Sequence, residues 1–144
     1  YTIGLTGSAA DFPLLETFHE RGGFGTADLR DAREISLVRL GSRRHLERLR
    51  TELAKPLLPN ASYQQALRLV QLLRTAGLSG HTDLVPAVCG HVANPVVFRR
   101  INPGKNAADA LSVIIDGVNP AAVATASGRS VDDWKAFCRE IGPR

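Results

Sequence analysis

Arginine is concentrated in one stretch of the chain, from Arg30 to Arg50. This stretch holds seven arginines and three acidic residues, and its local surplus of +4 equals the formal net charge of the whole chain. Guanidinium groups bind phosphate and carboxylate groups through paired hydrogen bonds. The stretch therefore predicts an anion-binding surface, and the charges of the rest of the chain sum to zero.

A turn followed by a helix is expected to position these arginines. Ile35–Leu40 is apolar and β-branched enough for a strand, Gly41 allows a tight turn, and Ser42 is a favoured N-cap residue. Arg43 and Arg44 then occupy the first helical turn, where backbone N–H groups and the helix dipole already attract anions. The predicted anion-binding residues are Arg39, Ser42, Arg43, Arg44, Arg48 and Arg50.

The predicted basic helix also has an apolar face. Three leucines recur on one side at helical spacing, and Arg44 and Arg48 fall near the opposite side. Glu47 and Glu52 lie within helical reach of the arginines, so a solvated and partly self-neutralised charged face is the alternative interpretation.

The composition fits one globular domain over residues 1–144. With 144 residues and 44% hydrophobic content, the chain can bury a core of its own. No apolar run reaches the roughly 20 residues that span a bilayer, so no membrane partner is predicted. Cys89 and Cys138 do not form a disulfide framework, which favours reducing surroundings and a cytoplasmic location. A single disulfide between them remains an alternative.

The order of predicted elements indicates a helix-rich α/β domain. Strands are predicted at Tyr1–Leu5, Ile35–Leu40 and Val96–Ile101, with residues 112–117 as a strand or as the end of a helix. About five helices are interleaved, one of them capped by Ser62 and closed by Gly77. The prediction is a domain with a small three- or four-stranded sheet, and residues 120–144 are predicted to pack on this domain as a C-terminal helical hairpin.

Two segments near the C-terminus suggest a nuclease. PGKNAAD and VIIDGVN resemble fragments of PIN-like metal-dependent ribonucleases, which gather several carboxylates around divalent ions. The resemblance implies Asp109 and Asp116 as catalytic acids. On one continuous helix their seven-residue spacing corresponds to a rise of about 10 Å, so further carboxylates such as Asp28 or Asp31 would have to complete the site.

The remaining candidate ligands do not predict a metal or a cofactor. His81, Cys89 and His91 form a cluster of soft ligands, but a structural zinc site needs four ligands, usually in paired short spacings. The five Phe, two Tyr and one Trp are too few to predict a base-stacking platform.

Three functions remain. The leading hypothesis is a small basic protein that binds the backbone of nucleic acid, RNA or nonspecific DNA rather than a specific operator, by counterion release at the arginine-rich helix. The first alternative is the metal-dependent nuclease. The second is an assembly module without nucleic acid, whose basic helix meets an acidic protein surface.

Overall fold

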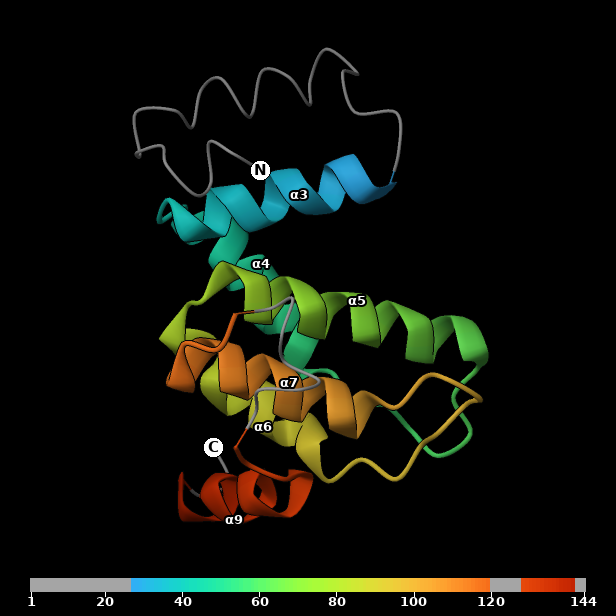
Figure 1. Ribbon diagram of the computed structural model, residues 1–144. Coiled ribbons are helices and arrows are strands. Elements are labelled where there is room, and N and C mark those ends of the chain that lie inside the picture. The colour runs from blue at the N-terminus through green and yellow to red at the C-terminus, as the bar shows by residue number, and fades with distance from the viewer. Residues whose placement is uncertain (1–26, 120–127, 142–144) are drawn as a thin grey trace. The chain divides into compact units, whose positions relative to one another are not determined.

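The structure is a computed structural model that describes residues 27–119 and 128–141, and in these ranges it is built from helices without a sheet (Figure 1). The predicted α/β fold with a three- or four-stranded sheet is therefore wrong for this part of the chain. The elements are α3 (Ala27–Arg39), α4 (Arg43–Ala54), α5 (Tyr63–Ser79), the 3-10 helix η2 (Thr82–Leu84), α6 (Val85–Val92), α7 (Pro103–Asp116) and α9 (Val131–Ile141).

The predicted strand at Ile35–Leu40 is the end of α3. The four residues from Ile35 to Val38 are all buried, which differs from the alternation of a half-buried strand. The helix ends in a Schellman motif, in which the N–H of Gly41 donates to the Val38 carbonyl at 3.0 Å and the N–H of Ser42 donates to the Leu37 carbonyl at 2.9 Å. Gly41 has a φ of 92°, so it ends a helix instead of following a strand.

The predicted strand at Val96–Ile101 is a tight turn. Its pairing is one isolated antiparallel bridge between Phe98 and Ile101, and Arg99 and Arg100 form the turn that joins them. Both arginines are exposed. Residues 112–116 belong to α7, and the predicted strand at Tyr1–Leu5 lies outside the described residues.

The chain groups into two compact units, Tyr1–Arg48 and Leu49–Arg144. The single domain over residues 1–144 stays a prediction. In the second unit, α5 packs against α7. A Cβ atom on Gly77 would lie 3.1 Å from the Cα atom of Ala110 in α7, so Gly77 lets the two helices approach closely. The prediction that Gly77 ends α5 is wrong, because the helix continues to Ser79 and is capped by Gly80, which has a φ of 67°.

The helix α6 packs against α7 and α9 in the same unit. A disulfide joins Cys89 of α6 to Cys138 of α9, across a sequence separation of 49 residues. Trp134 of α9 is fully buried and donates from Nε1 to the Ser112 hydroxyl of α7 at 3.1 Å. Of the predicted hairpin at 120–144, the structure describes only this helix and the residues just before it.

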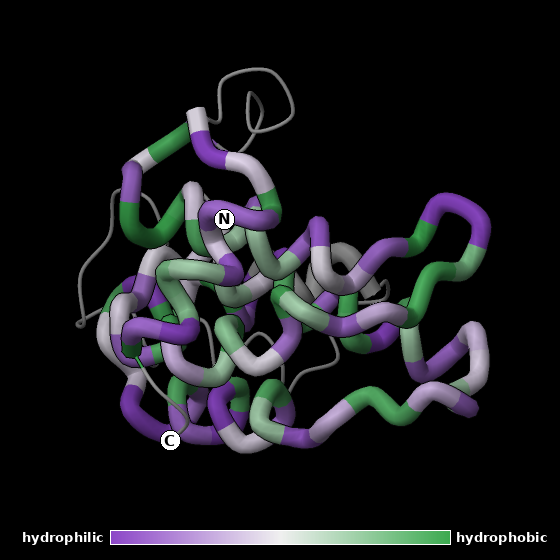
Figure 2. The backbone as a smooth tube through the Cα atoms, turned by 90° about the horizontal axis from the view of Figure 1, so that it is seen from below, coloured by the Kyte–Doolittle hydropathy of each residue, from purple (hydrophilic) through white to green (hydrophobic). Residues whose placement is uncertain are grey.

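Helices α4, α5, α7 and α9 are amphipathic, as expected for elements that bury one side. Figure 2 shows hydrophilic and hydrophobic residues alternating along the helical turns of the described chain. No helix within residues 27–119 and 128–141 combines the length and the hydropathy needed to cross a bilayer.

His91 is a buried titratable residue that fixes α6 to the end of α4. Its side chain lies inside the second unit, and the ring Nε2–H donates to the Leu53 carbonyl. Burial lowers the pKa of His91 below its ordinary value of 6.5, and the hydrogen bond to Leu53 offsets only part of this effect. The folded protein therefore holds the ring neutral at a pH where the unfolded chain begins to bind a proton.

Acidification should consequently destabilise the protein. Below about pH 6.5 the unfolded state binds more protons than the folded state, so the free energy of unfolding should fall as the pH is lowered from about 7 to about 5. The His91→Gln variant can donate a similar hydrogen bond without titrating, and its urea midpoint should depend less on pH. Equal pH dependence of the two proteins would show that His91 does not cause the effect.

Candidate anion-binding site

A three-residue turn places the predicted basic helix. Leu40, Gly41 and Ser42 connect α3 to α4, and α4 begins at Arg43. The carbonyl of Ser42 accepts the N–H of Leu46 at 3.0 Å, which is the first hydrogen bond of the helix. Arg43 and Arg44 therefore lie in the first turn of α4, where the N–H groups carry the positive end of the helix dipole.

The side chain of Ser42 is buried beside His45. Its hydroxyl lies 2.7 Å from Nδ1 of His45, and both residues are buried, at 8% and 4% exposure. The hydroxyl predicted to help bind an anion is thus occupied by a neighbouring ring and is closed to solvent. Ser42 is a structural residue in this arrangement.

Several arginines lie close enough to His45 to affect its pKa. Its pKa is lowered chiefly by burial and then by the positive charges of Arg33 and Arg48, with an opposing effect of Glu34 and a further lowering by Arg44. Guanidinium groups of both α3 and α4 therefore act on one ring. His45 is neutral at pH 7, and the positive charge of the site belongs to its arginines.

An ion pair joins the two helices. Arg48 Nη2 lies 2.9 Å from Glu34 Oε2, and the Arg48 side chain still exposes 60% of its surface. The pair fixes the first turns of α4 relative to α3. Arg48 contributes less net charge than its position suggests, since Glu34 neutralises part of it.

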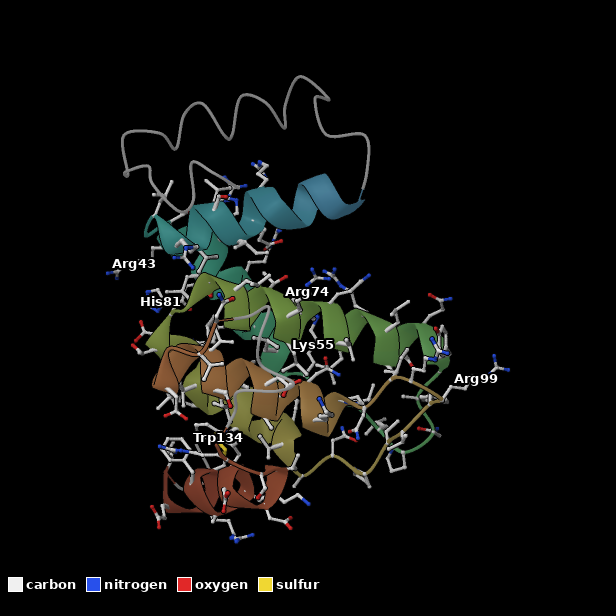
Figure 3. All side chains as sticks on the ribbon, viewed as in Figure 1. Arg43, Lys55, Arg74, His81, Arg99 and Trp134 are labelled. Carbon is white, nitrogen blue, oxygen red and sulfur yellow. A yellow bond between two sulfur atoms is a disulfide. The ribbon has the colours of Figure 1, made fainter. Side chains whose placement is uncertain are left out.

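Arg43 and Arg44 are the exposed cations of the site. Both lie on the surface, and no described carboxylate forms an ion pair with either. Figure 3 shows the Arg43 side chain extending away from the start of α4. Arg44 and Arg48 are one helical turn apart, with a rise of about 6 Å, so they share a face.

The predicted roles of Arg39 and Arg50 in anion binding stay predictions. Arg39 is exposed at the end of α3 and has an interaction of its own, as does Arg50. Arg50 belongs to the second compact unit, because the boundary falls after Arg48. The Arg30 side chain lies outside the described part of the structure. Arg43, Arg44 and Arg48 are the predicted arginines whose surroundings the structure describes in most detail.

The two acids of the nuclease alternative are engaged in separate ion pairs. Asp109 Oδ2 lies 3.2 Å from Lys105 Nζ, and Asp116 Oδ1 lies 3.1 Å from Arg129 Nη2. No group of three or more potential metal ligands occurs among the described residues. Of the soft ligands, Cys89 is in the disulfide and His91 is bonded to Leu53.

A second basic feature was not predicted from the sequence. Tyr63, at the start of α5, lies beside the turn that carries Arg99 and Arg100, and these residues line an open cavity of about 800 Å³ together with Phe98 and Ile101. The available indication was the pair of arginines between two apolar residues. We interpreted this pattern as a continuous strand, which hid the turn.

Comparison of the chain with protein-family models, curated proteins and solved structures finds no match. The geometry of the side chains is therefore the basis of the functional assignment.

Proposed function

We propose that the chain binds the sugar–phosphate backbone of nucleic acid, as RNA or nonspecific DNA, through Arg43, Arg44 and Arg48. The observation that carries the proposal is the position of Arg43 and Arg44. Both are exposed in the first turn of α4, and no described carboxylate pairs with them. Cations at this end of a helix are unfavourable by a few tenths of a kcal/mol each unless an anion lies over the helix end.

Phosphate satisfies both kinds of donor at this site. A guanidinium can donate two parallel hydrogen bonds to one phosphate, and the N–H groups of a first helical turn can donate to the same anion. The Arg48–Glu34 pair links α4 to α3, with 2.9 Å between the charged atoms. Contacts of this type read the backbone and not the base sequence, so the proposed binding is nonspecific.

Replacing both exposed arginines tests this proposal. Each phosphate contact in a single strand contributes about −0.7 to the slope of log K against log salt concentration, so Arg43→Ala/Arg44→Ala should make the slope shallower by about 1.4. Affinity for single-stranded RNA at low salt should fall about tenfold or more. The measurement is a fluorescence-anisotropy titration at several salt concentrations.

A second double variant controls for net charge. Arg68 and Arg74 are exposed on α5, and Arg68→Ala/Arg74→Ala removes the same charge from another helix. This variant should keep most of the salt dependence. If the two double variants have the same slope, or if the Arg43/Arg44 variant retains the wild-type slope, backbone binding at the start of α4 is excluded.

The disulfide bears on the compartment in which this binding takes place. The cysteine content led to the expectation of a cytoplasmic location. The Cys89–Cys138 disulfide argues for oxidising surroundings instead, because such bonds are rare in cytosolic proteins. We therefore propose an oxidising compartment.

A further inference from the structure

We infer that Tyr63, Arg99 and Arg100 form a second site, which takes one nucleotide of a single-stranded nucleic acid. The base of this nucleotide would stack on the Tyr63 ring, and the adjoining backbone phosphates would pair with the two guanidinium groups. This inference rests on the proposed function and deepens it, because it names single strands as the preferred ligand.

The aromatic part of the site is fixed and open to solvent. Tyr63 is the first residue of α5, directly after the Ser62–Gln65 capping box, and 47% of its surface is exposed. Phe98 packs against it edge to face, with ring centroids 6.3 Å apart and ring planes at 87°. A ring held in this way offers a base a stacking surface at little cost in side-chain entropy.

The two arginines are carried by a turn with a defined backbone. The turn is closed by two hydrogen bonds between backbone groups of Phe98 and Ile101, at 2.9 and 2.6 Å, and Ile101 is buried. Arg99 has a φ of 46°, a left-handed conformation that side-chain-bearing residues rarely adopt and that recurs at functional sites. Figure 3 shows the Arg99 side chain extending outward from this turn.

The chemistry of the cavity fits a nucleotide. Its volume of about 800 Å³ lies within the range of small-molecule sites, and no acidic residue is among the described residues that line it. An aromatic face beside two guanidinium groups matches a planar base beside a phosphate, which is the combination used by single-strand binders. A base stacked within a duplex cannot reach the ring, so the site should discriminate against duplexes.

Two kinds of variant separate the base contact from the phosphate contact. Tyr63→Leu should weaken binding of single-stranded RNA between about fivefold and about a hundredfold, while Tyr63→Phe, which keeps the ring, should bind nearly as the wild type does. Arg99→Gly relieves the backbone strain, so it should fold at least as stably as the wild type and nevertheless bind more weakly. Duplex binding should change little in Tyr63→Leu.

Photocrosslinking of the full chain to a short RNA that carries 5-iodouridine provides the decisive readout. We expect the crosslinked peptide to contain Tyr63, and we expect the crosslink to be lost in Tyr63→Leu. Crosslinks elsewhere, together with unchanged affinity of Tyr63→Leu, would overturn this inference even if the Arg43/Arg44 variant still lost binding, in which case the proposed function would stand. Absence of binding by the wild type to any RNA or DNA would overturn both.

Discussion

Replacing Trp134 by alanine should lower the free energy of unfolding of the second unit by about 3–5 kcal/mol. Trp134 is fully buried, and its removal leaves a cavity where α9 packs against α6 and α7. The substitution also removes the edge-to-face contact with Phe137, at 5.3 Å between ring centroids, and the contact with Arg129, whose guanidinium carbon lies 4.6 Å from the centre of the indole ring.

Urea unfolding followed by far-ultraviolet circular dichroism measures this effect without relying on indole fluorescence. Trp134→Phe should cost less than alanine, because the phenyl ring fills more of the cavity that the indole leaves. Ser112 keeps its own hydrogen bond to the Ala108 carbonyl at 3.2 Å in either variant. Val97→Ala, at a residue that is 60% exposed, should change stability by less than about 0.5 kcal/mol. A loss in Trp134→Ala no greater than in Val97→Ala would mean that α9 does not depend on this side chain.

Features set by neighbouring residues could be predicted from the sequence. The helix start at Ser62 is confirmed, because Ser62 and Gln65 satisfy each other's backbone donors over a spacing of three residues. The turn at Gly41 could also be predicted locally, because a glycine readily adopts the positive φ that the turn requires. The helix after it begins at Arg43, which places the two exposed arginines in its first turn.

Features set by distant residues could not be predicted in this way. Ile35 to Val38 contain enough apolar and β-branched residues for a strand, and their burial on consecutive positions depends on packing that the local pattern does not contain. Gly77 has the residue type of a helix end, but the close approach of Ala110 in α7 explains a glycine inside the helix.

Reducing the disulfide should be the other large perturbation of the second unit. The bond between Cys89 and Cys138 closes a loop across a sequence separation of 49 residues. The loop-entropy relation gives a stabilisation of about 4 kcal/mol for a loop of this length, through the restriction of the unfolded chain. Wild-type protein in reducing agent should therefore unfold at a markedly lower urea concentration than the oxidised protein.

The double variant Cys89→Ser/Cys138→Ser provides the matched control. It should unfold near the midpoint of the reduced wild type, and reducing agent should not shift it further. Titration of the native protein with a thiol reagent should detect no reactive cysteine before reduction. Detection of two thiols in the untreated protein would contradict the disulfide, and the proposal of an oxidising compartment would lose its support along with it, because that proposal depends on this bond alone.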